Sequence, residues 1–277
     1  MGAAMALPPL QTVAVDGLRL AWREAGQGTP LVLLHGIGSA SDSWEYQLAH
    51  FAGDFRVVAW DAPGYGGSSD FNIETPSAAD FADALDRLLG ALGIERCHLV
   101  GHSLGALIAA AFASRHPDWI RSLTLANAAS GHGRLDAKTR AARLHERLGD
   151  LEAYGPAGMA ERRAPRLVAP GASPEALARV QAVMARVRPA GYSRAARMLA
   201  EGDIFADLAH IDRPTLVMCG TLDRVTPEES NRAIAKALSR GRFEPLPGLG
   251  HASYVESPEL FNLVLGRFLA ERASEAA

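Results

Sequence analysis

The chain has 277 residues, of which 48% are hydrophobic and 21% are charged, as is usual for a globular protein that buries a large core. A formal net charge of −3 gives no support for binding to nucleic acid or to a membrane surface. The sequence lacks a run of 18 apolar residues, and its start, Met1–Leu10, lacks the pattern of a signal peptide. We therefore expect a cytoplasmic protein with neither a cofactor nor a metal ion.

Short apolar segments along the chain predict strands. The first two flank Asp16-Gly17, a dipeptide that favours a hairpin turn. The continuous run Leu31–Leu34 has the length of a buried strand. In chain order, the predicted strands are Thr12–Val15, Leu18–Trp22, Leu31–Leu34, Phe55–Trp60, Arg96–Val100, Leu123–Ala126, Pro214–Cys219 and Arg242–Leu246.

Apolar residues at helical spacing separate most of these strands. A helix is expected over Ser41–Phe51, and the next is expected to be capped by Thr75 with Pro76 at its first position. The segment Thr226–Glu229 has the pattern of a capping box, and a last helix begins near Ser257. Strands that alternate with helices in this way predict a mostly parallel sheet with helices on both faces.

The character of the chain changes at Asn127. Residues 131–203 contain 13 Lys and Arg against 8 Asp and Glu, read mostly as helix, and include no strand pattern. We expect this region to be a helical cap, residues 128–205, over the carboxyl edge of the sheet. The core would then consist of residues 1–127 and 206–277, giving one α/β domain with an insertion.

Two cysteines, Cys97 and Cys219, are present, and each lies in an apolar strand-like segment. Thiols in such positions are usually packed in the core. We therefore expect neither a disulfide nor a metal site to be built from them.

The pentapeptide Gly101-His102-Ser103-Leu104-Gly105 has the Gly-x-Ser-x-Gly pattern of a nucleophile elbow. A predicted strand precedes it, and the alanine-rich run Ala106–Ser114, which reads as a buried helix, follows it. The glycines permit close backbone packing and a strained serine conformation at this strand-to-helix turn. Such a pattern also occurs by chance in glycine-rich chains, but this context favours Ser103 as a nucleophile.

A serine nucleophile needs a base, and the base needs a carboxylate to orient it. Asp223 and His251 each follow a predicted strand, where the carboxyl ends of parallel strands place functional loops. The order Ser103, Asp223, His251 is the order of this elbow type. Asp212 and Glu228 are alternative acids, although Asp212 precedes its strand and Glu228 lies in the first turn of a helix, where it can stabilise the helix terminus.

Backbone N–H groups are expected to stabilise the oxyanion that forms during acyl transfer. We predict the N–H groups of Leu104, which begins the elbow helix, and of Ile37, which lies between two glycines after the Leu31–Leu34 strand. His35 and His102 are other potential bases near this site. Their positions favour structural hydrogen bonds for both.

Five ordered segments carry a resemblance to the α/β-hydrolase superfamily over nearly the whole chain. They are His35–Gly38, Asp61–Ser68, the elbow at Gly101–Gly105, Gly220–Pro227 and Gly250-His251. Within the superfamily, the core and cap resemble the 3-oxoadipate enol-lactonase and carboxylesterase branch. The resemblance implies an eight-stranded, mostly parallel sheet with a helical cap, and Ser103, Asp223 and His251 as the catalytic triad.

These observations predict a serine hydrolase that cleaves a small carboxylic ester or lactone through an acyl-enzyme. Three alternatives stay open: a carbon–carbon hydrolase of a ring-fission product, a cofactor-free haloperoxidase or perhydrolase, and a ligand sensor without efficient turnover. The substrate is expected to be a small molecule, with or without a carboxylate. Arginines of the cap suited to holding such a group are Arg134, Arg140, Arg143, Arg162, Arg163, Arg166 and Arg188. A solvated helix face is the alternative interpretation of these arginines.

Overall fold

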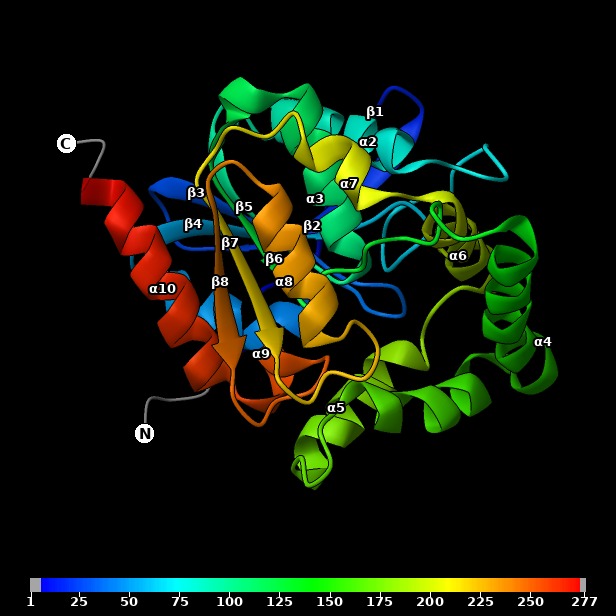
Figure 1. The fold of residues 1–277 in the computed structure, drawn as a ribbon. Coiled ribbons are helices and arrows are strands. Elements are labelled where there is room, and N and C mark those ends of the chain that lie inside the picture. The colour runs from blue at the N-terminus through cyan, green and yellow to red at the C-terminus, as the bar shows by residue number, and fades with distance from the viewer. Residues whose placement is uncertain (1–5, 275–277) are drawn as a thin grey trace.

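The computed structural model describes residues 6–274, in which eight strands form one sheet (Figure 1). The strand order is β1-β2-β4-β3-β5-β6-β7-β8, and only the pairs β1–β2 and β2–β4 are antiparallel. The strands are β1 (Gln11–Val15), β2 (Leu18–Ala25), β3 (Thr29–Leu34), β4 (Phe55–Asp61), β5 (Cys97–His102), β6 (Ile120–Ala126), β7 (Thr215–Gly220) and β8 (Gly241–Leu246). The prediction of an eight-stranded, mostly parallel sheet is confirmed.

Helices cover both faces of this sheet, as predicted. On one face, α2 (Ala78–Ala91), α3 (Leu104–Arg115), α7 (Ile204–Leu208) and α8 (Glu228–Ala237) enclose an apolar core that includes Phe81, Phe112 and Ile234. On the other, α1 (Glu45–Phe51) and α10 (Pro258–Ser274) pack Leu48 and Phe261 against the strands. α3 is buried on nearly every side, which explains its run of alanines between β5 and its neighbours.

Short helical turns complete the core. They are the 3₁₀ turns Ser41–Trp44 and Pro117–Trp119 and the one-turn helix α9 (Ser253–Glu256). The predicted helix at Ser41–Phe51 is therefore a 3₁₀ turn that continues into α1. Within residues 6–274, no helix is long and apolar enough to cross a membrane. The first five residues, part of the segment inspected for a signal peptide, lie outside the described residues.

The predicted start of α2 was wrong by two residues. Ser77, and not Thr75, caps the helix: its hydroxyl accepts a hydrogen bond from the Asp80 backbone N–H, and the Asp80 carboxylate accepts one from the Ser77 backbone. Two such reciprocal hydrogen bonds satisfy donors that the first turn leaves free. Pro76 then lies before the cap, outside the helix.

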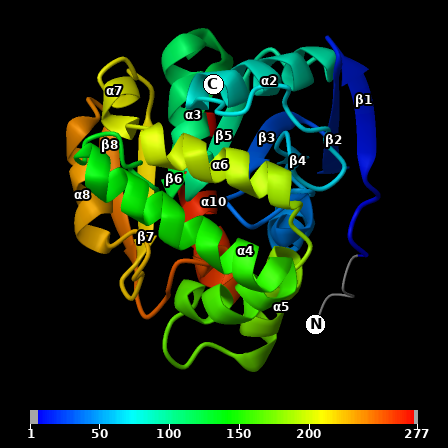
Figure 2. The same ribbon diagram turned by 90° about the vertical axis from the view of Figure 1, so that its right-hand side faces the viewer.

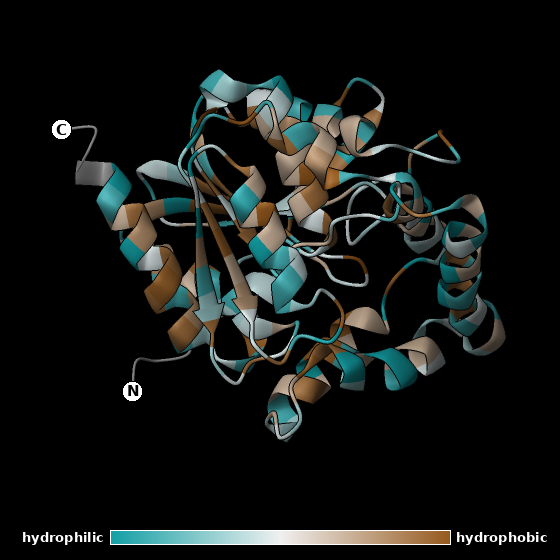
Figure 3. Cartoon of the chain, in the orientation of Figure 1, coloured by the Kyte–Doolittle hydropathy of each residue, from teal (hydrophilic) through white to brown (hydrophobic). Residues whose placement is uncertain are grey.

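Three helices between β6 and β7 form an insertion beyond the carboxyl ends of the strands, and we call α4, α5 and α6 the insertion helices (Figures 1 and 2). They span Ala137–Leu167, Pro174–Met184 and Pro189–Glu201. α4 is kinked at Gly155, which has φ 63° and precedes Pro156. Many hydrophilic residues lie along α4, whereas the strand β7 is largely apolar (Figure 3). The division into a core and a cap stays a prediction, and α7 crosses its boundary at residue 205.

Candidate active site

Ser103 lies in a sharp turn between β5 and α3, and its backbone is strained. It has φ 53° and ψ −116°, a combination that costs a non-glycine residue about 1–3 kcal/mol. The flanking glycines permit this turn for a steric reason. A Cβ on Gly101 would lie 2.3 Å from the carbonyl oxygen of Gly105, and a Cβ on Gly105 would lie 2.4 Å from that of Leu34. The Gly-x-Ser-x-Gly spacing therefore reflects two places where the backbone leaves no room for a side chain.

The structure brings Ser103, His251 and Asp223 together from the ends of β5, β8 and β7. His251 Nε2 lies 2.9 Å from Ser103 Oγ, and His251 Nδ1 lies 2.8 Å from Asp223 Oδ2. All three residues are buried, with exposed fractions of 4–6%. Because Asp223 accepts from Nδ1–H, the lone pair of Nε2 faces the serine hydroxyl, which is the tautomer that a general base requires.

The alternative acids make other contacts. Asp212 lies before β7 and accepts a hydrogen bond from Ser239. Glu228 forms an ion pair with Arg232 one helical turn later in α8. Asp223 is therefore the candidate acid that contacts His251.

Five hydrogen bonds from nitrogen and oxygen donors converge on the carboxylate of Asp223. Oδ2 accepts from His251, from Asn127 Nδ2 at 2.8 Å and from Thr226 Oγ1 at 2.6 Å, while Oδ1 accepts from the N–H groups of Val225 and Thr226. Burial alone raises the pKa of this carboxyl group, but the charge of His251 and these hydrogen bonds outweigh it and hold the pKa well below its usual value. Asp223 is therefore ionised wherever the protein is folded near neutral pH.

Sequence reasoning missed Asn127 and Thr226. Asn127 has φ 45° at the end of β6, and Ser253 Oγ donates to its Oδ1 at 2.6 Å, which turns the amide Nδ2 toward Asp223. The predicted capping box at Thr226 was wrong, because Pro227 precedes α8 and no side chain caps the helix. The Thr226 hydroxyl bonds Asp223 instead. A polar residue directly after β6 was the only signal for Asn127, and none distinguished Thr226 from a cap.

His35 and His102 make structural hydrogen bonds, as expected. His35 Nδ1 donates to the Gly36 carbonyl at 2.9 Å, and its Nε2 accepts from the Ala62 N–H at 3.1 Å. His102 Nε2 donates to the carbonyl oxygen of His251 at 2.8 Å. Burial, followed by the nearby charge of His251, lowers the pKa of His102 to about 3, so His102 is neutral near pH 7.

The loop after β3 packs directly against the elbow. A Cβ on Gly36 would lie 2.9 Å from Ser103 Cβ, and Gly38 has φ 80°. Ile37, between these glycines, lines the same cavity as Ser103. Leu104 is the first residue of α3, so its N–H has no partner within its own helix. The two predicted oxyanion donors thus lie on adjoining segments, and their role stays a prediction.

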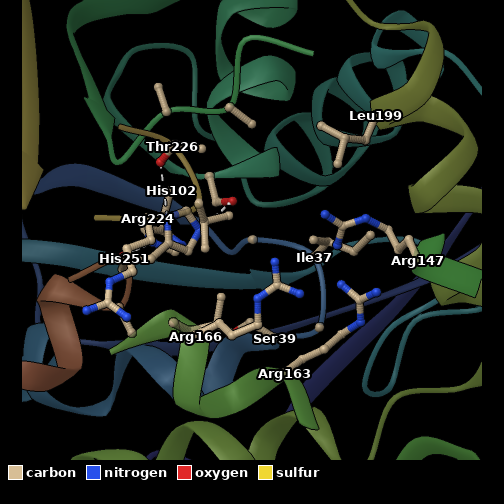
Figure 4. A pocket seen from close by; sticks show the side chains of 18 of the residues that line it. Ile37, Ser39, His102, Arg147, Arg163, Arg166, Leu199, Arg224, Thr226 and His251 are labelled. Carbon is tan, nitrogen blue, oxygen red and sulfur yellow. Dashed lines mark hydrogen bonds between the residues drawn. The ribbon is translucent and has the colours of Figure 1, made fainter. Parts of the chain in front are cut away.

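A cavity of about 730 Å³ opens over Ser103 between the strand ends and the insertion helices (Figure 4). Its apolar lining includes Val183, Met184 and Leu199. The arginines that line it are Arg134, Arg143, Arg147, Arg163, Arg166, Arg179 and Arg224. Among the described lining residues, Glu146 is the one carboxylate outside the triad region. The cavity is therefore strongly basic on the side away from the sheet.

Four of the seven arginines predicted to suit a substrate carboxylate line the cavity, and their binding role stays a prediction. Arg134, Arg143, Arg163 and Arg166 line the cavity, whereas Arg140, Arg162 and Arg188 do not and instead form ion pairs with Glu201, Asp150 and Asp70. Arg147, Arg179 and Arg224 were missed. Their spacing in the sequence does not differ from that of arginines on solvated faces, so sequence reasoning had no signal for them.

Comparisons with known proteins agree with this architecture. The family described as alpha/beta hydrolase fold matches residues 29–258. A putative carbamate hydrolase, RutD, of Yersinia enterocolitica is 32% identical over 257 residues, which cover 88% of this chain and 90% of the relative. A thermophilic esterase from Thermogutta terrifontis, solved with malate bound, superposes with a TM-score of 0.85 at 28% identity over 94% and 97% of the two chains. The enol-lactonase from Burkholderia xenovorans superposes with a TM-score of 0.84 at 25% identity over 94% and 100%.

Proposed function

The chain belongs to the α/β-hydrolase family, and from this premise we propose that it is a serine hydrolase that cleaves a small ester or lactone through an acyl-enzyme. The observation that carries the proposal is the continuous hydrogen-bonded chain from Ser103 through His251 to Asp223 at the floor of a cavity. A volume of about 730 Å³ suits a small molecule.

The geometry supports the following mechanism. His251 Nε2 takes the proton of Ser103 Oγ as the oxygen attacks the substrate carbonyl. The N–H groups of Leu104 and Ile37 stabilise the resulting oxyanion. His251 then protonates the leaving group, and an acyl-enzyme forms on Ser103. Water that gives its proton to His251 attacks the acyl-enzyme, and His251 returns this proton to Ser103 Oγ as the acid is released. Asp223 holds the imidazole orientation and stabilises the imidazolium in both steps.

Carbamate hydrolysis is a second candidate, because the RutD relative carries that name. A carbamate presents the same carbonyl centre to Ser103, and the two activities differ in the group expelled. Carbon–carbon hydrolysis and perhydrolysis use the same triad, but no observed contact of Ser103 favours either. The ester or lactone reaction therefore comes first in the tests.

Hydrolysis of 4-nitrophenyl acetate and butyrate by the purified protein tests the proposal. Ser103→Ala should reduce kcat by about 10⁴-fold or more. Ser130→Ala is the matched control, since Ser130 lines the same cavity and, among the residues described, its hydroxyl bonds the Gly131 carbonyl alone. Equal turnover by wild type and Ser103→Ala would refute the mechanism. A single turnover followed by a stable acylated protein would instead indicate a ligand sensor.

A further inference from the structure

The cavity arginines differ in whether a carboxylate already compensates their charge. Four of the seven form an ion pair with a carboxylate. Arg134 lies 2.9 Å from Asp203, Arg163 lies 2.9 Å from Asp150, Arg166 lies 3.7 Å from Glu146, and Arg179 pairs with Glu45. Two of these pairs join the two halves of α4 across its kink, one joins the segments that precede α4 and α7, and the pair Arg179–Glu45 ties α5 to α1. Their guanidinium groups therefore have a structural partner before any ligand binds.

Arg143 and Arg147 have no such partner. Within residues 6–274, neither forms an ion pair with a carboxylate, and both line the cavity from α4. They are four residues apart, so their side chains lie on one face of the helix. Two like charges at this spacing destabilise a helix. An arrangement that costs stability in the free protein is explained if a bound anion offsets the charge.

His132 strengthens this observation. It lines the cavity beside the two arginines, and its backbone N–H bonds the Leu199 carbonyl. Burial, and then the charges of Arg143 and Arg147, lower the pKa of His132 to about 4. Both guanidinium groups are therefore near the imidazole, which is neutral and able to donate a hydrogen bond at pH 7. All three residues line the cavity, and His132 and Arg147 both hydrogen-bond α6, at Leu199 and Tyr192.

Contacts along the cavity wall connect this cluster to Ser103. Gly36 packs on Ser103, and Gly38, two residues later, packs on the ring of Tyr192. Two residues of chain span at most about 7 Å. Arg147 Nη1 then donates to Tyr192 Oη at 3.4 Å. Figure 4 shows Arg147 directed into the cavity near Ile37. A series of contacts along one cavity wall thus connects Ser103 with Arg147.

We propose that Arg143, Arg147 and His132 bind a carboxylate of the substrate, so that the substrates of this site are monoesters or lactones of dicarboxylic acids. The inference rests on the proposed hydrolase function, and it names the substrate class. A guanidinium matches a carboxylate with two parallel hydrogen bonds, and two guanidinium groups carry the charge that a free carboxylate requires. Arg224 also lacks a carboxylate partner in the described chain, but it lies in the loop after Asp223 and not on an insertion helix, and it serves below as an alternative.

The kinetic test compares mono-4-nitrophenyl adipate with 4-nitrophenyl hexanoate. The esters share a six-carbon acyl chain, and adipate is long enough that its carboxylate does not readily attack its own ester. Wild type should favour the charged ester in kcat/KM. Arg147→Gln should lower kcat/KM for the charged ester by about 10- to 100-fold, mainly through KM, and leave the hexanoate ester within about twofold. Arg147→Lys should restore only part of the loss, because an ammonium group keeps the positive charge but cannot form two parallel hydrogen bonds with a carboxylate.

Two variants separate a specific site from general attraction. Lys138→Gln removes a positive charge from the same helix outside the cavity, and it should leave the preference unchanged. Arg224→Gln should also leave it unchanged. Loss of the preference in either variant, with none in Arg147→Gln, would overturn the assignment. Equal kcat/KM values for the two esters in wild type would overturn it as well.

A binding measurement makes the inference independent of turnover. Adipate should raise the melting temperature of Ser103→Ala, adipamide should not, and Arg143→Gln combined with Arg147→Gln should abolish the shift. If the hexanoate ester is hydrolysed by Ser103 but adipate gives no shift, the carboxylate site is wrong and the hydrolase function stands. If adipate binds but Ser103→Ala hydrolyses both esters as well as wild type, the catalytic proposal is wrong and the carboxylate site stands.

Discussion

The two walls of the cavity differ in whether their charged side chains have partners in the protein. On the sheet side, Asp223 is buried and accepts five hydrogen bonds from nitrogen and oxygen donors, and His251 is held at both nitrogens. On the insertion side, Arg143 is exposed and Arg147 half-buried, and neither meets a carboxylate within the described residues. The sheet side is thus organised before a ligand arrives, whereas the insertion side has charge that a ligand has still to compensate. We therefore propose that residues of the sheet side carry out the reaction and that residues of the insertion side select the substrate.

The difference follows from the supporting structure. Each triad residue sits at the carboxyl end of a parallel strand, where strand register fixes the loops relative to one another. The arginines lie on α4, which has few buried residues. Their long side chains can therefore adapt to a bound ligand. Matched substitutions in the core and in the insertion should therefore differ in their effects on activity or stability.

The largest effect is expected from Asp223→Asn. The amide cannot accept the Nδ1–H in the same way, so His251 takes the wrong tautomer and kcat for 4-nitrophenyl butyrate should fall by about 10⁴-fold. Asp212→Asn, which changes the acid at the opposite end of β7, is the matched control and should retain full activity. A similar loss in both variants would mean that position 223 has no special role.

A glycine pair compares the packing of the two regions. Gly105→Ala places a Cβ 2.4 Å from the Leu34 carbonyl oxygen and should lower the free energy of unfolding by about 3 kcal/mol. Gly149→Ala changes the same residue type within α4, where nothing beyond the adjacent residues and the local helix backbone lies within 4 Å of the new Cβ, and it should stabilise by about 0.5–1 kcal/mol. Urea unfolding of the wild type and of each variant measures both changes. Tolerance of Gly105→Ala would contradict the tight elbow.

A smaller effect concerns a buried histidine of the sheet. Burial, and then the charge of Arg121, lower the pKa of His98 to about 4 from 6.5. Below pH 6.5, His98 binds a proton in the unfolded chain but stays neutral in the folded chain. The free energy of unfolding therefore falls as the pH decreases toward 4, by up to about 1.4 kcal/mol per pH unit. In His98→Gln the unfolding free energy should fall less steeply over this range. Equal slopes for the variant and wild type, measured by urea unfolding at several pH values, would contradict the buried neutral imidazole.

The sequence was sufficient for the sheet and for the three residues brought together at its edge, because strand periodicity and Gly-x-Ser-x-Gly are local patterns with steric causes. It was not sufficient for Asn127 or Thr226, since their contacts with Asp223 join segments 96 and 3 residues apart through side-chain geometry. It also failed to separate Arg147 from Arg162. Both are helical arginines, and only the kink at Gly155 and the packing of α4 decide which one faces the cavity.

The most direct test of the central claim is the mass of the protein after rapid acid quenching during turnover of 4-nitrophenyl butyrate. The proposed mechanism predicts a fraction of the protein that carries one butyryl group, located on the peptide that contains Ser103 and absent from Ser103→Ala. Rapid turnover that is unaffected by Ser103→Ala, with the adduct absent or on another residue, would contradict it.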